Sequence, residues 1–137
     1  MNRLTLAEEH LQALIEHARA CYPNEAVGLL GGPSPGEVSA VYRLENLGPP
    51  HTFLADPFGQ WAALEDMKRM NTQLVAVYHS HPDGGTTPSD ADLHFARGWD
   101  ALFLIVALKA ANEASVAVGA YRLNQERYET IAIVARE

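Results

Sequence analysis

Residues 74–82, with the sequence LVAVYHSHP, decide the fold of this chain. The first five are apolar or aromatic, which is typical of a central strand covered on both faces. Side chains two positions apart on a strand point to the same face, so His79 and His81 share one face. Pro82 lacks an N–H for the next rung of a ladder and ends the strand. The stretch therefore predicts a buried strand that carries two imidazoles at its carboxyl end.

The residues after this strand add a carboxylate. Ser89 and Asp92 have the spacing of a capping box, so we expect Ser89 to cap a helix that runs to about residue 97. Asp92 then lies in the first turn, where its carboxylate points back toward the strand. Two imidazoles and one carboxylate form the ligand set of a catalytic zinc, which keeps a fourth position for water. Zinc lowers the pKa of such a water to ~7, so a metal-dependent hydrolase is expected.

Each of these features also has an ordinary interpretation. Ser89 and Asp92 alone are a serviceable helix cap, and His79 alone could be a surface imidazole. The combination favours the metal site, because a buried strand leads into the histidines and a capped helix follows them. The polar loop 83–87 is interpreted as a lip over this site.

The rest of the chain predicts a mixed sheet flanked by helices. Thr5 and Glu8 form a capping box for a first helix that Pro23 ends, and Asp56-Pro57 begins a second. The apolar stripe of the second helix is expected to cover the sheet: Phe58, Trp61, Leu64 and Met67. Further strands are expected at 26–30, 38–44, 101–108, 115–122 and 128–134, with a short extended piece at 52–55 and turns at 31–36, 110–112 and 124–125.

Length and charge narrow the function classes. The 137 residues suggest a single domain, 1–137. Net charge −7 without a basic stripe disfavours nucleic acid, and no apolar run is long enough for a membrane span. Charged residues from Glu8 onward interrupt the start before a signal-peptide core forms. The lone Cys21 excludes an internal disulfide and a multi-cysteine zinc site, which fits a cytoplasmic location.

A hydrolase also needs a base and a donor for the oxyanion. Glu25 stands at the edge of an apolar strand, where a charged residue has little packing reason to be. Ser89, three residues before Asp92, is placed to face the same cavity. The other histidines give weaker evidence of a metal role: His10, His17, His51 and His94. We expect His10 and His17 on one solvated or half-buried helix face.

The motif resembles that of the JAMM, or MPN+ (Mov34-type), zinc metalloproteases. Their signature is an upstream glutamate, His-Ser/Thr-His-Pro, a serine after seven residues and an aspartate after two more. Here it reads Glu25, His79-Ser80-His81-Pro82, Ser89 and Asp92, without a departure. The resemblance covers essentially the whole chain, and implies a JAMM/MPN domain with a cytidine-deaminase-like core.

The resemblance also implies roles. His79, His81 and Asp92 would bind Zn²⁺, Glu25 would act as general base and then acid, and Ser89 would stabilise the oxyanion. Short prokaryotic relatives process ubiquitin-like or sulfur-carrier proteins by cutting after a C-terminal Gly-Gly. We expect such a tail as partner, and the exposed helices allow a homodimer.

Three other functions compete with this one. A non-catalytic MPN-type scaffold or binding module is disfavoured because all five functional residues are present. A DNA-repair-associated metal hydrolase is disfavoured by the acidic charge. A zinc nucleoside deaminase would need a Pro-Cys-x-x-Cys segment, which one cysteine cannot supply.

Overall fold

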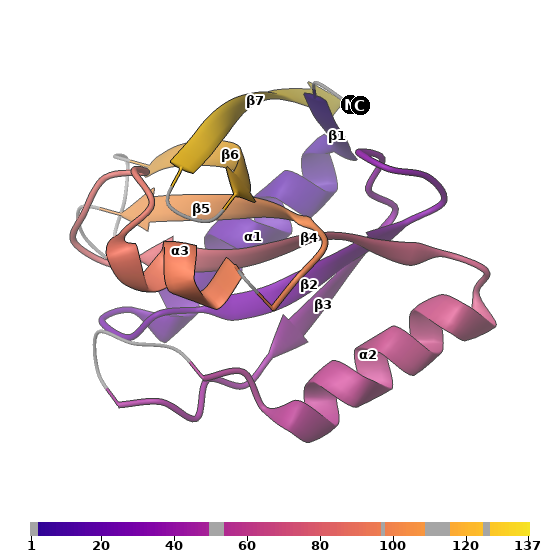
Figure 1. Cartoon of the computed structure of the whole chain (residues 1–137), viewed down its shortest axis with the longest axis horizontal. Helices are drawn as coiled ribbons and strands as arrows, with labels where there is room; N and C mark the ends of the chain where they lie inside the picture. The colour runs from indigo at the N-terminus through magenta and orange to yellow at the C-terminus, as the bar shows by residue number, and fades with distance from the viewer. Residues whose placement is uncertain (1–2, 50–53, 97, 109–115, 125–126) are drawn as a thin grey trace.

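The computed structural model describes residues 3–49, 54–96, 98–108, 116–124 and 127–137. A sheet with strand order β1-β7-β6-β5-β4-β2-β3 carries α1 on one face and α2 and α3 on the other (Figure 1). The pairs β1–β7 and β4–β5 are parallel, and the other pairs are antiparallel, so the predicted mixed, mostly antiparallel sheet is confirmed. The elements are β1 (Arg3–Ala7), α1 (Glu8–Cys21), β2 (Val27–Gly32), β3 (Ala40–Leu44), α2 (Pro57–Arg69), β4 (Gln73–His81), α3 (Asp90–Ala96), β5 (Leu102–Leu108), β6 (Val116–Asn124) and β7 (Arg127–Arg136).

Strand β4 lies between β2 and β5 and is buried over most of its length, as its apolar run predicts. Tyr78 and Ala76 point into the cluster that packs against α1. Val77 points to the opposite face, into the cluster shared with α2 and α3. Because side chains alternate along a strand, His79 and His81 follow Val77 onto the face that carries α2 and α3.

The two faces of the sheet support separate apolar clusters. The α1 cluster includes Leu4, Leu14, Leu30, Leu104 and Val106, all of which are fully buried. The cluster under α2 and α3 is smaller and includes Leu29, Met67, Ala96 and Phe103. The face that carries α2 and α3 thus has the smaller apolar cluster, and polar side chains lie on it at the end of β4.

The N-terminal segment differs from the prediction. Thr5 does not cap a helix but lies in the middle of β1, which pairs in parallel with β7. Its N–H donates to the Gly36 carbonyl and its carbonyl accepts from the Val38 N–H. The residue before α1 is Ala7, which makes no side-chain cap. The backbone pairing of Thr5 with two segments distant in sequence therefore outweighs the local capping pattern.

Helix α2 begins as predicted, with the Asp56 carboxylate accepting from the Phe58 N–H, but its predicted buried stripe is wrong. Phe58 is 82% exposed and Trp61 64% exposed, whereas Met67 is buried. Residues three apart on a helix turn by about 300°, so four of them in series spread over about 180° of its surface. The face that meets the sheet is centred on Ala63 and Met67 instead.

The other predicted strands are confirmed with shifted ends. Strand β2 continues to Gly32, within the predicted turn 31–36, and forms the expected antiparallel pair with β3. Of the short extended piece at 52–55, Ala55 forms an isolated bridge with Asn46, while residues 52 and 53 lie outside the described residues. The predicted turn at 110–112, the first residue of the predicted strand 115–122 and the second residue of the predicted turn 124–125 also lie outside them. Among the described helices, none is long and apolar enough to cross a membrane.

Candidate metal centre

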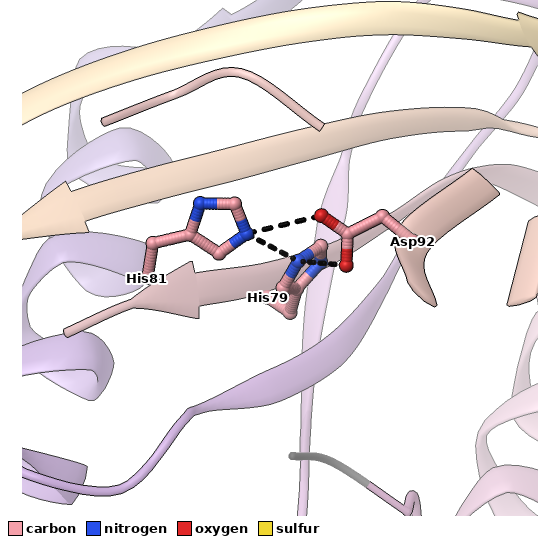
Figure 2. A group of neighbouring side chains, drawn as sticks. All are labelled: His79, His81 and Asp92. Atoms are coloured by element: carbon pink, nitrogen blue, oxygen red, sulfur yellow. Dashed lines mark hydrogen bonds and ion pairs between the residues drawn. The ribbon is translucent and has the colours of Figure 1, made fainter. Parts of the chain in front are cut away.

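His79 and His81 bring their imidazoles together at the end of β4 (Figure 2). Their Nε2 atoms are 3.1 Å apart, with His79 buried and His81 partly exposed. The approach follows from the strand period, since only Ser80 separates them and its side chain turns to the α1 face. The strand thus presents two nitrogen atoms to one point, as predicted.

Asp92 completes the group from the first turn of α3. Its Oδ1 lies 3.0 Å from Nε2 of His79, and its Oδ2 lies 3.0 Å from Nε2 of His81. Among the described residues, these three form the cluster that could hold a metal ion, with all ligand atoms within 4.8 Å of one another. The predicted grouping of His79, His81 and Asp92 is therefore found.

The electrostatics of the cluster favour an ionised carboxylate. Burial alone would raise the pKa of Asp92, but hydrogen bonds from His79 and His81 outweigh burial and hold that pKa far below its ordinary value. Burial alone would likewise lower the pKa of His81. Its bonds with Asp92 and the Gly85 carbonyl, together with the charges of Asp92 and Glu25, raise it instead. The site is built around negative charge and attracts a cation.

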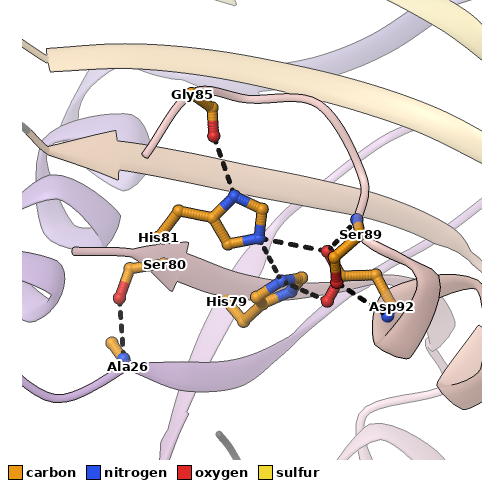
Figure 3. Close-up of polar contacts among 7 residues, drawn as sticks. All are labelled: Ala26, His79, Ser80, His81, Gly85, Ser89 and Asp92. Atoms are coloured by element: carbon orange, nitrogen blue, oxygen red, sulfur yellow. Dashed lines mark hydrogen bonds and ion pairs between the residues drawn. The ribbon is translucent and has the colours of Figure 1, made fainter. Parts of the chain in front are cut away.

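The tautomer of His81 is set by the loop that follows β4. Nδ1 of His81 lies 2.8 Å from the Gly85 carbonyl oxygen, so Nδ1 carries a proton that it donates (Figure 3). In the neutral ring, Nε2 then presents a lone pair toward Oδ2 of Asp92. Two acceptors at that distance need a proton or a metal cation between them. The loop 83–87, expected as a lip, thus contacts His81 through Gly85 and orients this candidate ligand.

These donors fit a divalent metal. A tetrahedral ion with bonds of ~2.1 Å separates its ligand atoms by ~3.4 Å. The separation of 3.1 Å between the two Nε2 atoms is close to that value, and each Nε2 has one of the two Asp92 oxygens at 3.0 Å. Two imidazole nitrogens and one carboxylate oxygen also match the donor types of catalytic zinc sites. The three side chains therefore suit a metal with a fourth position left for water or substrate.

Ser89 precedes α3 and exchanges two hydrogen bonds with Asp92. Its Oγ accepts from the Asp92 N–H at 3.1 Å, and its own N–H donates to Oδ2 of Asp92 at 2.9 Å. This is the predicted capping box, and it fixes the carboxylate of the candidate ligand. Ser89 is an exposed residue, and the cap uses only an acceptor lone pair of its hydroxyl, so the O–H remains able to donate. One hydroxyl can therefore cap the helix and serve the site.

Glu25 lies next to the histidines through the pairing of β2 and β4. Val27 is paired with His79, and the Ser80 N–H donates to the Ala26 carbonyl at 3.0 Å, which extends the ladder by one residue. By this register Glu25 stands opposite His81, on the same face of the sheet. Glu25 is buried, and its charge acts on the pKa of His81. The structure thus places Glu25 beside His81 on this face, while the metal cluster itself consists of His79, His81 and Asp92.

The other histidines lie elsewhere. His17 is buried, contrary to the predicted solvated or half-buried face, and its Nδ1 lies 2.7 Å from the Tyr78 hydroxyl on the α1 side of the sheet. His94 is exposed on α3 and His10 is half-buried on α1. His51 lies outside the described residues.

Sequence reasoning missed two features near the site. The Gly85 carbonyl was not expected to orient His81, because a backbone acceptor leaves no mark in the sequence beyond a glycine-bearing loop. The other feature is Asn46, whose amide donates to the Glu25 carbonyl at 2.9 Å. Its position 21 residues after Glu25 gives no local signal of contact.

The fold and the candidate metal centre at the end of β4 agree with one protein family. The chain belongs to the family of prokaryotic homologues of the JAB domain, whose pattern matches residues 7–124. This is the short prokaryotic type of JAMM domain that the motif indicates, and the related proteins below are named as proteases, peptidases or desampylases.

Three relatives illustrate the family. A probable TtuB-protein conjugate cleaving protease of Thermus thermophilus is 40% identical over 100 residues, which cover 69% of this chain and 66% of the relative. The chain therefore matches about two thirds of that relative's length. A CysO-cysteine peptidase of Mycobacterium tuberculosis is 29% identical, with 77% and 74% covered. A desampylase of Pyrococcus furiosus is 27% identical, with 81% and 79% covered.

Solved structures agree on the fold. A protein from Desulfitobacterium hafniense superposes with a TM-score of 0.87 at 31% identity and covers 98% of this chain and 93% of its own. A JAB1/MPN domain protein from Archaeoglobus fulgidus superposes with a TM-score of 0.63 at 18% identity, with 100% and 98% covered. The second likeness shows the fold alone, and it confirms the predicted JAMM/MPN architecture.

Proposed function

We propose that this chain is a zinc-dependent peptidase that cleaves the amide bond after the C-terminal Gly-Gly of a ubiquitin-like or sulfur-carrier protein. The observation that carries the proposal is the convergence of His79, His81 and Asp92, with Glu25 on the same face of the sheet. A buried carboxylate beside an open metal position is what a water-activating hydrolase requires.

Zinc is proposed because its preferred donors match those present, two imidazole nitrogens and one carboxylate oxygen. When bound, it would polarise the scissile carbonyl and make a water acidic near neutral pH. His81 is held for this purpose by its Nδ1–H bond to Gly85, and Asp92 by the Ser89 N–H. Both ligands are thus oriented by backbone groups rather than by flexible side chains.

Glu25 is proposed as general base and then general acid. It would take a proton from the attacking water and deliver it to the leaving nitrogen. Its burial keeps it away from bulk solvent. The O–H of Ser89 would donate to the oxyanion of the tetrahedral intermediate while its oxygen still caps α3.

The substrate class is proposed from the relatives. Two of them are named for cleaving TtuB–protein conjugates and for acting on CysO-cysteine, and a third is a desampylase. A tail that ends in Gly-Gly has no side chain beyond Cα, so it can enter a narrow approach to the metal. The reducing cytoplasm, inferred from the lone Cys21, is the proposed location.

The test uses zinc-loaded protein and ubiquitin-like carriers from the same organism, each extended by a short peptide past Gly-Gly. Mass spectrometry would locate the cut, which we expect directly after the second glycine. A His79→Ala protein is the matched control for loss of the metal. Zinc-loaded protein that leaves every carrier intact would favour a non-catalytic scaffold and contradict the proposal.

A further inference from the structure

The peptide group that joins Glu25 to Ala26 anchors the backbone of Glu25. This peptide lies at the entrance to β2, where the ladder with β4 ends. Its carbonyl accepts from Nδ2 of Asn46 at 2.9 Å. Its N–H donates to Oγ of Ser80 at 2.7 Å (Figure 3). Both hydrogen-bonding groups of the peptide are therefore held by side chains, from two different segments of the chain.

The bond to Ser80 departs from ordinary strand pairing. In a hydrogen-bonded antiparallel pair, each residue donates to the carbonyl of the other. Here the Ser80 N–H donates to the Ala26 carbonyl, but the Ala26 N–H turns to the Ser80 hydroxyl. Ser80 is 1% exposed, so this hydroxyl has no access to bulk water. The serine between the two histidines thus fixes where the Glu25 segment leaves the sheet.

Asn46 is itself held in one orientation. Its Oδ1 accepts from the N–H groups of Gly48 and Leu54, both at 2.9 Å. Because the amide oxygen is committed to these two donors, the amide nitrogen must point toward the Glu25 carbonyl. The loop after β3 therefore presents a preset donor to the peptide that carries the proposed base.

We propose that Asn46 and Ser80 are positioning residues, which clamp the Glu25–Ala26 peptide and so set the carboxylate of Glu25 against the metal. The inference rests on the proposed hydrolysis, because it assigns these residues through the general base. A base misplaced by about 1 Å can cost about 100-fold in rate. Loss of either clamp should therefore lower kcat while the ligands of the metal stay in place.

Asn46→Asp is the sharpest variant. A carboxylate at this position keeps the acceptor for Gly48 and Leu54 and so keeps the loop, but it cannot donate to the Glu25 carbonyl. Asn46→Ala is the neutral companion, which separates loss of the donor from gain of charge. Asn71→Asp is the matched control, because it makes the same chemical change at an exposed turn with φ 59°.

The readouts are kcat and KM on an extended carrier, zinc content and melting temperature. We expect both Asn46 variants to lose about ten- to a hundredfold in kcat, with KM and zinc unchanged, and Asn71→Asp to behave as wild type. Ser80→Ala should lose kcat in the same way, and Ser80→Thr, which restores a hydroxyl, should recover it. A fall in melting temperature with unchanged kcat would assign Asn46 to the loop alone.

The outcomes separate this inference from the function on which it rests. Wild-type protein that cleaves no carrier overturns both. Active wild type with an unchanged kcat in Asn46→Ala overturns the clamp alone. A loss of activity only in Asn46→Asp would trace the effect to added charge, and parallel loss of zinc in Ser80→Ala would trace it to the ligands. Each of these last results also contradicts the positioning role.

Discussion

Ser89 caps α3 and is the proposed oxyanion donor, and substitution can separate these two roles. Its Oγ accepts the Asp92 N–H at 3.1 Å, while its O–H is the proposed donor to the oxyanion. Ala removes both functions, Thr keeps both, and Gly keeps most of the cap because glycine is itself a good N-cap residue. The series Ser89→Ala, Ser89→Gly and Ser89→Thr therefore varies helix stability and catalysis independently.

The expected sizes follow from the two contacts. Loss of an N-cap side chain costs about 1 kcal/mol for Ala and a few tenths for Gly. For a chain of 137 residues, 1 kcal/mol corresponds to a melting-temperature change of about 4 °C. Loss of one oxyanion donor costs about 10²–10³ in kcat. Ser89→Ala and Ser89→Gly should thus lose similar activity, although only Ser89→Ala loses appreciable stability.

The assay measures kcat on an extended carrier, melting temperature and zinc content for all four proteins. Zinc content should stay constant, because the Ser89 N–H that holds Asp92 belongs to the backbone. If kcat followed melting temperature across the series, with Ser89→Gly almost as active as wild type, Ser89 would be a cap only. The oxyanion role would then be refuted.

Three further predictions test the fold. The pKa of His17 is lowered to about 4 by burial and by the Arg43 charge. Between about pH 6.5 and about pH 4 the His17 side chain is protonated in the unfolded state but not in the folded state. The free energy of unfolding therefore drops by up to about 3 kcal/mol as pH falls from about 6.5 toward about 4. Urea titrations at several pH values should show a weaker pH dependence of this free energy in His17→Gln. Gly28→Ala should cost about 1–3 kcal/mol, since its Cβ would lie 2.3 Å from the Tyr78 ring, and a thermal melt as stable as wild type would contradict that packing. Trp61→Ala should change the unfolding free energy by less than about 0.5 kcal/mol and Met67→Ala by about 2–5 kcal/mol; the reverse order in chemical denaturation would restore the originally predicted stripe.

The candidate site was predictable because its ligands lie close together in sequence. His79 and His81 are two apart on one strand, and Asp92 is in the first turn of the next helix. The strand period and a helix cap suffice to bring such residues to one point. Its place at the edge of an apolar strand singled out Glu25, but its role needed the resemblance to a family, since its approach to the histidines depends on the pairing of β2 with β4, which no local pattern specifies.

The wrong predictions for Thr5 and helix α2, and the missed contact of Asn46, share one physical origin. Thr5 has a good capping pattern, yet its backbone pairs with β7 and with the segment that holds Gly36 and Val38. The spacing of Phe58 and Trp61 is helical, but spacing alone does not say which face meets the sheet. Asn46 escaped notice because its partner is a carbonyl distant in sequence. A local sequence pattern does not predict contacts made by the backbone or contacts between residues far apart in the sequence.

The central claim is that Glu25 activates water at a metal held by His79, His81 and Asp92. The most direct test compares the cleavage rate of Glu25→Gln with that of wild type at equal zinc content, on a carrier extended past Gly-Gly. The account predicts one zinc per chain in both proteins and a rate about 10²–10⁴ lower in the variant. Equal zinc with a rate within a few-fold of wild type would contradict it.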